Sequence, residues 1–214
     1  MNICFAIAHY KFFHSHRLDL TKELAKTHTV SIVTDCSEAI PEEIKYLKSL
    51  GIEIINLPSR SKKNGYIPYA LSLRRVIQNI NPEIVFYVTL EMSVFGAMIH
   101  HLLKIKKSFF LITGLGPFFY RTKLKYLALK YIQRLLFAFA LMKKNCLFVF
   151  QNTDDLEVFI DLKIANQSNV KMIRGNGVNA SDLIYRDRKY EDKVIFLYAS
   201  RLVLSKGILE FINA

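Results

Sequence analysis

Short apolar runs alternate with segments of helical periodicity along the whole chain, and this alternation constrains the fold more than any other feature. Apolar runs occur at 3–8, 30–34, 52–57, 84–88, 109–113, 146–150 and 170–173. Unbroken apolar runs are typical of strands that are covered on both faces, as in parallel sheets. The β-α-β-α order therefore predicts an α/β fold with a doubly wound, mainly parallel, Rossmann-like sheet and right-handed crossovers.

Helical patterns fill the spaces between these runs, at 15–26, 41–50, 69–80, 92–103, 124–142 and 154–164. Ser15 is available to cap the first of these helices. Pro41 opens the second helix and Gly51 follows its end, which is the usual asymmetry of proline and glycine at helix termini. The stretch 9–17 is expected to be a loop after the first strand.

The pattern divides the chain of 214 residues into three parts. Residues 1–174 are expected to form one domain, because they hold the seven apolar runs and their helices. Residues 175–192 are expected to form an interdomain corner and a charged linker. Residues 193–214 are expected to begin a second domain with a strand at 194–199 and a helix that opens at 205–207.

Charge limits the choice of partners. Lys and Arg number 30 against 18 Asp and Glu, and the net charge of +12 favours nucleic acid, anionic lipid or phosphorylated substrates. The sequence has no helix-turn-helix, RNA-recognition or zinc-finger signature, so no nucleic-acid partner is expected.

Cysteine usage and hydropathy indicate the compartment. The three cysteines are far apart and form no C-x-x-C, which argues against disulfides or a zinc site and fits a reducing cytosol. The N-terminus has no basic region typical of a signal peptide. The apolar run 135–142 is far shorter than the roughly 20 residues of a spanning helix. The sequence predicts a cytoplasmic protein, either soluble or peripheral on the inner face of the plasma membrane.

The loop after the first strand offers the first candidate site, because ligands of doubly wound sheets bind at the carboxyl ends of the strands. Its candidates for a cleft or acceptor site are His9, His14 and His16. No Asp, Glu or Cys lies close enough to complete a familiar metal-ligand pattern, so no metal is expected. The other interpretation is that Phe12 and Phe13 plug the core while their polar neighbours face the cleft. The loop has no G-x-G-x-x-G, so no dinucleotide fingerprint is present.

Two further stretches have both a functional and a structural interpretation. Gly114 and Gly116 follow a strand, where glycines let a ligand approach the backbone, but they also suit a tight turn. The helix at 124–142 has cations among Tyr, Leu and Phe, and a basic face opposite an apolar one can lie on anionic lipid. The alternative is an ordinary packed helix with a solvated basic face. The membrane-surface candidates are Arg121, Lys123, Lys125, Lys130 and Arg134.

The turn from Arg201 to Lys206 is the last candidate site. It is expected to join the strand at 194–199 to the opening of a helix, and helix N-termini bind anions. Arg can grip phosphate bidentately and Lys supplies a compact charge. A βα turn with two surface cations is the alternative.

Four patches in order along the chain resemble the family 4 glycosyltransferases of the GT-B fold, especially bacterial enzymes that build surface glycans such as lipopolysaccharide and capsule. The first is Phe12-Phe13-His14-Ser-His16-Arg17 followed by Val30-Ser-Ile-Val-Thr34. The second is Phe148 to Asp155, which includes Asn152, a further candidate for the cleft or acceptor site. The third is Gly175-Asn-Gly177-Val178-Asn179, similar to the family's interdomain corner. The fourth is Phe196 to Gly207, similar to the start of its nucleotide-sugar domain.

The resemblance implies a two-domain enzyme with its active site between Rossmann-like halves. The N-terminal half would bind a glycan or lipid-linked acceptor and the C-terminal half a nucleotide-sugar, which is a donor substrate rather than a cofactor. Arg201 and Lys206 match the pair that contacts the donor diphosphate. Retention of configuration and independence of metal are also implied.

Two departures from the family pattern shape the expected activity. Gly114-Leu115-Gly116 stands where the family often has a histidine, so no catalytic residue is assigned. The family's E-x7-E region would lie beyond Ala214, so the chain alone is expected to transfer no sugar. The alternative function is a non-catalytic membrane-surface or partner-binding module, completed by a separate C-terminal half.

Overall fold

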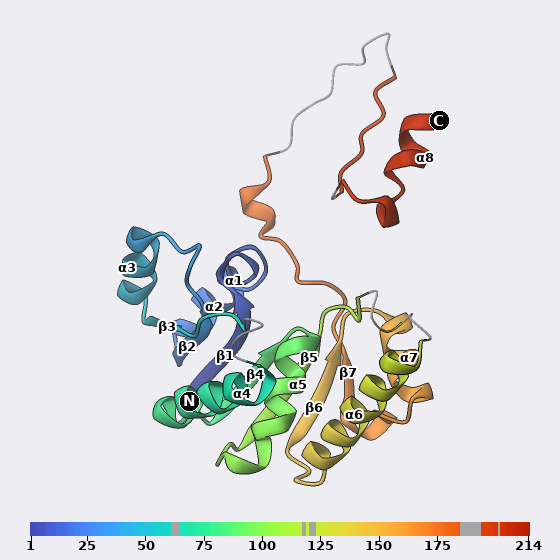
Figure 1. The fold of residues 1–214 in the computed structure, drawn as a ribbon. Coiled ribbons are helices and arrows are strands. Elements are labelled where there is room, and N and C mark those ends of the chain that lie inside the picture. The colour runs from blue at the N-terminus through green and yellow to red at the C-terminus, as the bar shows by residue number, and fades with distance from the viewer. Residues whose placement is uncertain (61–64, 117–118, 120–122, 185–193, 201) are drawn as a thin grey trace. The chain divides into compact units, whose positions relative to one another are not determined.

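The computed structural model describes residues 1–60, 65–116, 119, 123–184, 194–200 and 202–214 (Figure 1). The strands are β1 (Asn2–His9), β2 (Thr29–Asp35), β3 (Ile52–Asn56), β4 (Ile84–Val88), β5 (Lys107–Ile112), β6 (Cys146–Phe150) and β7 (Val170–Met172). They form one seven-stranded sheet in the order β3-β2-β1-β4-β5-β6-β7, and every neighbouring pair is parallel. The predicted fold class is confirmed.

Helices cover the two faces of the sheet in two groups. The helices are α1 (Tyr10–His16), α2 (Leu18–Ala25), α3 (Pro41–Ser49), α4 (Tyr66–Ile80), α5 (Leu90–Ile99), α6 (Leu124–Leu141), α7 (Thr153–Asp161) and α8 (Ile208–Asn213). Helices α1–α3 pack on one face, where Phe5, Phe13 and Leu47 share a core, and α4–α7 pack on the other, where Tyr87, Phe95 and Phe137 share a larger core. The chain passes from one face of the sheet to the other between α3 and α4. As a result, the strand order reverses between β1 and β4.

The segment after β1 is a helix, so the prediction of a loop at 9–17 was wrong. Tyr10, Phe13 and Arg17 are all buried, and their spacing of three and four residues places them on one helical face. Burial of this face stabilises α1 where local residue preferences indicate a loop. Ser15 is therefore not a helix cap: it lies within α1, where its hydroxyl donates to the Lys11 carbonyl at 2.8 Å.

Two predicted helices begin earlier than expected. Helix α4 begins at Tyr66 rather than Tyr69, with Pro68 in its first turn, where the missing N–H of proline has no intrahelical partner to lose. Helix α5 begins at Leu90 rather than Met92, because Thr89 acts as its N-cap. It ends at Ile99, and a short 3-10 helix, His100–Leu102, follows.

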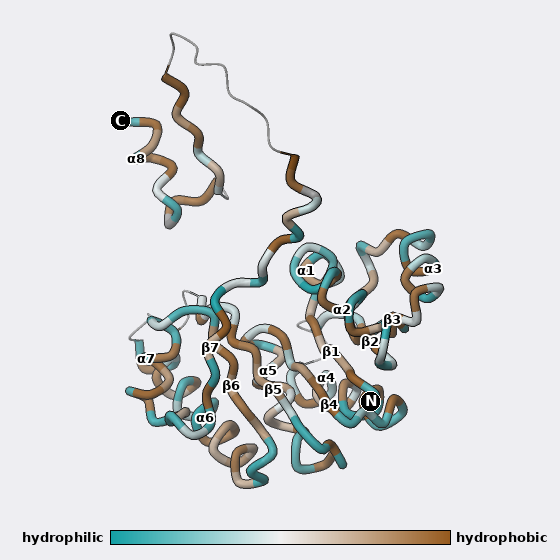
Figure 2. The backbone as a smooth tube through the Cα atoms, turned by 180° about the vertical axis from the view of Figure 1, so that it is seen from behind, coloured by the Kyte–Doolittle hydropathy of each residue, from teal (hydrophilic) through white to brown (hydrophobic). Residues whose placement is uncertain are grey.

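The chain divides into two compact units, Met1–Val178 and Asn179–Ala214. The described part of the second unit has two 3-10 helices, Ala180–Asp182 and Leu204–Lys206, and α8. The predicted strand at 194–199 is absent, although Figure 2 shows its apolar colour. Val194 and Leu197 are each 81% exposed. The described residues of this unit include no strand that could pair with this run, and unpaired strand backbone has no partner for its hydrogen bonds.

No helix in the described part of the chain is long and apolar enough to cross a membrane.

Candidate functional site

The carboxyl edge of the sheet near the switch between β1 and β4 brings together side chains from three strand ends. Asp35 ends β2 and accepts hydrogen bonds from the backbone N–H of Ser37 at 2.9 Å and of Ser59 at 2.8 Å. Ser59 lies beyond β3, and its hydroxyl is 3.4 Å from Nδ1 of His9, the last residue of β1. His9 and Ser59 thus offer two neighbouring hydrogen-bonding groups at the crevice where ligands of such sheets bind.

Asp35 holds this arrangement as an anion. Burial would raise the pKa of its carboxyl group, but the hydrogen bonds from Ser59 and Ser37 outweigh burial and hold the pKa well below its usual range. The carboxylate therefore ties the segment after β3 to the end of β2 throughout the neutral pH range.

Arg60 supplies a cation beside this group. Its guanidinium lies over the ring of Tyr66, 4.2 Å from the ring centre, and its Nε is 3.5 Å from Oε1 of Glu91 at the start of α5. The Arg60 side chain is 26% exposed. A guanidinium that is fixed by an aromatic ring and faces a crevice is suited to bind phosphate or carboxylate oxygens.

The backbone is strained where β4 passes into α5. Thr89 has a φ of 86°, which is rare for a β-branched residue. Its N–H donates to the Leu111 carbonyl, its hydroxyl caps the N–H of Met92, and its carbonyl accepts from Ser93. These bonds hold the strained residue at the strand switch, and strain of this kind concentrates at functional sites.

The other two histidines of the predicted site do not join His9. His14 faces α3, where its Nε2 lies 2.7 Å from Oε1 of Glu43. His16 stacks on Phe12, with 4.3 Å between the ring centres, and its Nδ1 contacts the hydroxyl of Ser15. The structure thus leaves His9 as the histidine of α1 and its flank that lies with Ser59 at the strand ends.

The predicted glycine turn follows β5 at the same edge of the sheet. Gly114 and Gly116 have φ values of 152° and 64°, and a Cβ atom on either would meet no heavy atom within 4 Å. Leu115 between them is buried. The backbone on both sides of this anchoring residue is thus open, as the approach of a ligand requires.

Asn152, predicted as a cleft residue, caps a helix. Its side-chain oxygen accepts from the N–H of Asp155 at 2.8 Å, and its Nδ2 donates to the Asp155 carboxylate at 2.9 Å. Both hydrogen bonds stabilise the N-terminus of α7.

Arg17 is a buried cation that the candidate residues from the sequence did not include. It is 7% exposed, and burial lowers the pKa of its guanidinium. Its Nη1 donates to the side-chain oxygen of Asn176, which also accepts from Gln151. None of the ion pairs within the described residues involves Arg17. This bridge links the start of α2 to the ends of β6 and β7.

Helix α6 differs from the predicted basic face opposite an apolar one. Its core side has Phe137 and Ala140, both fully buried. Its outward side is itself apolar, because an exposed stripe repeats at helical spacing and lies opposite these two residues. The stripe consists of Leu124, Ala128, Tyr131, Leu135, Phe139 and Met142.

The cations of α6 flank this stripe instead of forming a face of their own. By helical spacing, Lys125 lies on one side of it, and Lys123, Lys130 and Arg134 lie on the other. Arg121, the fifth membrane-surface candidate, lies outside the described residues. An exposed apolar stripe with cations on both sides matches the interface of an anionic membrane.

The predicted donor pair is partly described. Lys206 ends a 3-10 helix and is exposed, and Gly207 with a φ of 75° separates it from α8. Lys206 therefore precedes the helix rather than lying in its first turn. Its carbonyl accepts from the Tyr198 hydroxyl at 3.1 Å. Arg201 lies outside the described residues.

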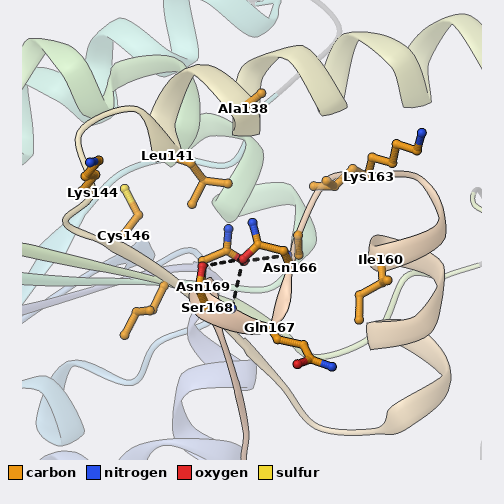
Figure 3. A pocket seen from close by; sticks show the side chains of 13 residues that line it. Ala138, Leu141, Lys144, Cys146, Ile160, Lys163, Asn166, Gln167, Ser168 and Asn169 are labelled. Atoms are coloured by element: carbon orange, nitrogen blue, oxygen red, sulfur yellow. Dashed lines mark hydrogen bonds between the residues drawn. The ribbon is translucent and has the colours of Figure 1, made fainter.

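No cluster of histidine, cysteine and acidic side chains suitable for a metal ion occurs in the described ranges. A cavity of about 850 Å³ lies at the opposite, amino edge of the sheet (Figure 3). There, Asn166, Ser168 and Asn169 bond to one another within their own turn. Cys146 is 3.1 Å from Nε2 of His100, and burial raises the pKa of its thiol to about 12. These groups stabilise the fold.

Sequence reasoning missed Arg60 and Arg17 for different reasons. Arg60 follows the apolar run at 52–57 in a polar basic stretch, and its place just after a strand was the available signal. Arg17 is part of the first patch that resembles the family, but it was not named as a site residue. Only the helical spacing of Tyr10, Phe13 and Arg17 would have indicated that its side chain is buried.

Comparisons with known proteins agree with this geometry. Residues 2–152 match the family described as "Glycosyl transferase 4-like". A Campylobacter jejuni N,N'-diacetylbacillosaminyl-diphospho-undecaprenol alpha-1,3-N-acetylgalactosaminyltransferase is 23% identical over 189 residues, which are 79% of this chain and 49% of that protein. The chain thus spans about half the length of this curated relative.

Solved structures show the same fold at low identity. A glycosyltransferase from Rickettsia africae has a TM-score of 0.52 at 14% identity, over 80% of this chain and 42% of that one. The sucrose-phosphate synthase of Thermosynechococcus elongatus has a TM-score of 0.53 at 8% identity, over 80% and 47%. The family match covers more than half of the chain and includes β1–β6 with the crevice at their carboxyl ends. The chain therefore belongs to the glycosyl transferase 4-like family.

Proposed function

We propose that this chain is the acceptor-side part of a glycosyltransferase that moves a sugar from a nucleotide-sugar to a lipid-linked acceptor of a bacterial surface glycan. The observation that carries the proposal is α6, whose exposed apolar stripe has Lys125 on one side and Lys130 and Arg134 on the other. The name of the Campylobacter relative supports it, because that protein acts on a diphospho-undecaprenol acceptor. The family match favours this enzyme function over a non-catalytic binding module.

In the proposed reaction, the bond from the sugar's anomeric carbon to the donor phosphate breaks and a bond to the acceptor oxygen forms. The acceptor hydroxyl gives its proton to the departing nucleoside diphosphate, on which negative charge builds up as the bond to the sugar breaks. Arg201 and Lys206 would stabilise that charge, as cations aimed at a developing anion do. We further propose that the reaction retains configuration and needs no metal ion.

On the acceptor side, the proposed role of α6 is to place the crevice at an anionic membrane surface. Its stripe would enter the interface between headgroups and acyl chains, and Lys125 and Arg134 would contact anionic headgroups from either side. Each cation near such a surface contributes about 1 kcal/mol.

Vesicle flotation tests the membrane part. The chain should float with vesicles that contain phosphatidylglycerol, and less so at high salt. The double substitution Lys125→Gln and Arg134→Gln should weaken binding by roughly 30-fold. Lys22→Gln with Lys48→Gln, which removes the same charge from α2 and α3, is the matched control. Equal binding to neutral vesicles, or equal loss in both double variants, would contradict the proposed role of α6.

A transfer assay tests the catalytic part. The 214-residue chain alone is expected to transfer no sugar, because its residues 179–214 include no described strand that could form a donor crevice. Labelled nucleotide-sugars are incubated with lipid-linked acceptors and the chain, and the lipid fraction is counted. Label in that fraction would refute the expected inactivity and identify the donor directly.

A further inference from the structure

A groove runs along the seam between α5 and α6. Its volume is about 420 Å³, which lies within the range of ordinary small-molecule sites. Its walls are almost entirely apolar. The lining residues are Leu90, Val94, Phe95 and Met98 of α5, Leu129, Ile132, Gln133 and Leu136 of α6, and Arg60, Tyr66 and Glu91 at one end.

The charged end of the groove lies at the carboxyl edge of the sheet. Glu91 is in the first turn of α5, directly after β4, and Arg60, which contacts Glu91, follows Ser59 directly in the chain. Because both helices run away from that edge, Met98 and Leu136 mark the far end. The groove thus leads from the candidate site along the outer surface of α5 and α6.

The groove also reaches the outward surface of α6. Leu129 and Ile132 line the groove, and they are 44% and 50% exposed. By helical spacing Ile132 lies beside Ala128 and Leu135 of the exposed stripe. An apolar path therefore connects the stripe of α6 with the groove.

We propose that this groove holds the first isoprenoid units of the acceptor's lipid chain, with the adjoining phosphate at Arg60. The inference rests on the proposed function, which supplies a lipid-linked acceptor, and it adds the place where the chain binds. A hydrocarbon chain needs no hydrogen bonds and gains free energy from each buried methylene group. The anionic end of such a lipid matches the position of Arg60, the cation among the described lining residues.

Charge and polarity favour this occupant over a peptide segment. A peptide would bring backbone N–H and carbonyl groups, and burying them without partners is costly. Among the described residues, the long walls of the groove offer only Gln133 as an uncharged polar partner, since Tyr66 lies at the charged end. Glu91 competes with a phosphate for Arg60, so the phosphate is expected to displace a weak, half-exposed ion pair.

Calorimetric titration of the 214-residue chain tests the proposal without requiring sugar transfer. The probes are farnesyl diphosphate, geranyl diphosphate and inorganic pyrophosphate, all used as monomers in solution. One added isoprene unit should raise affinity at least roughly tenfold, because it buries several more methylene equivalents. Pyrophosphate should bind most weakly of the three.

Three variants locate the binding. Val94→Trp fills the groove and should weaken farnesyl diphosphate at least tenfold while leaving pyrophosphate unchanged. Leu71→Trp places the same side chain on the exposed surface of α4 and is the matched control, which should change nothing. Arg60→Gln should weaken all three probes by a similar factor of roughly ten, as the loss of a charged hydrogen bond does. Circular dichroism confirms that each variant folds.

The possible failures are distinguishable. If farnesyl diphosphate binds Val94→Trp as tightly as it binds the unsubstituted protein, the groove is not the lipid site. This result would leave the proposal of a lipid-linked acceptor unaffected. If the unsubstituted protein binds farnesyl and geranyl diphosphate equally well, a lipid site in this half is refuted. The proposed lipid-linked acceptor then loses the support of this groove. If Val94→Trp instead abolishes a dimer seen by light scattering, a second copy of the chain occupies the groove and the proposal is wrong.

Discussion

Helices α5 and α6 are neighbours that both contain many apolar residues, but most of α5 is buried and most of α6 is not. In α5, six of the ten residues are buried, including Phe95, Gly96 and Ala97. In α6, only Phe137 and Ala140 are buried among eighteen residues. A helix that is apolar all round is normally buried all round. Helix α5 follows this rule because the sheet, α4 and α6 enclose it. Helix α6 packs Phe137 and Ala140 against the protein and leaves its stripe largely exposed, with Phe139 stacked on His101 at one end.

The difference teaches that apolar residues in this half serve two purposes. Those of α5 and the inner side of α6 stabilise the fold, and those on the outer side of α6 are available to a partner. Stability and membrane binding should therefore respond to different residues of the same helix.

The largest expected effect separates the two sides of α6. Phe137→Ala should lower the free energy of unfolding by about 3–5 kcal/mol, because it leaves a cavity among Phe110, Phe148 and Phe159. Phe139→Ala, at a site that is 50% exposed, should cost less than about 1 kcal/mol. Urea denaturation followed by circular dichroism measures both. Similar losses would show that the stripe is part of the core.

The next effect concerns the close packing of α5. A Cβ atom on Gly96 would lie 2.5 Å from Cγ of Tyr87, whose ring is fully buried. Gly96→Ala should therefore destabilise the protein by about 1–3 kcal/mol, although alanine favours helix by about 1 kcal/mol over glycine.

Ala128→Leu is the matched control for this substitution, because it adds bulk to the exposed stripe of α6. It should change stability by less than about 0.5 kcal/mol. Destabilisation by Ala128→Leu as large as that by Gly96→Ala would contradict the contrast between the helices.

A polar residue in the stripe should affect binding more than folding. Leu135→Gln should change the free energy of unfolding by less than about 0.5 kcal/mol. In vesicle flotation it should lower affinity by at least roughly fivefold, because it removes an apolar side chain from the proposed interface. Unchanged flotation would exclude Leu135 from the membrane contact.

The smallest effect is a pH dependence at the far end of α5. Burial lowers the pKa of His100, whose Nε2 is 2.8 Å from Oδ1 of Asn145. The unfolded chain therefore binds a proton more readily, so this contribution to stability is complete above about pH 6.5 and falls as the pH drops below it. Denaturation midpoints at about pH 7 and about pH 5.5 measure the fall, which His100→Asn should reduce. An equal fall in the variant would assign it to other groups.

Much of the fold could be predicted because its strands are encoded locally. Runs such as Val30–Thr34 and Cys146–Phe150 are apolar enough to be read as strands covered on both faces, and the structure pairs both in parallel. The helix at 10–16 was missed because its stability depends on burying Tyr10 and Phe13 against the sheet. The predicted strand at 194–199 is not observed, because apolar residues without a neighbouring strand to pair with do not form a sheet.

The candidate site was predicted less completely than the fold. Its location followed from the strand order, and His9 was named correctly as a residue at the carboxyl end of β1. Arg60 and Glu91 were not predicted as site residues. Their contact joins residues 31 positions apart, and it depends on the crossover from β3 to α4.

The sequence by itself determined the parallel α/β sheet and carried the motifs of a glycosyl transferase 4-like chain, because strand periodicity and short motifs depend on neighbouring residues. Only the tertiary structure decided which apolar helix is covered and which is exposed. The same apolar surface lowers the free energy of folding in α5 and remains in contact with water on α6, and the arrangement of the surrounding elements makes that difference.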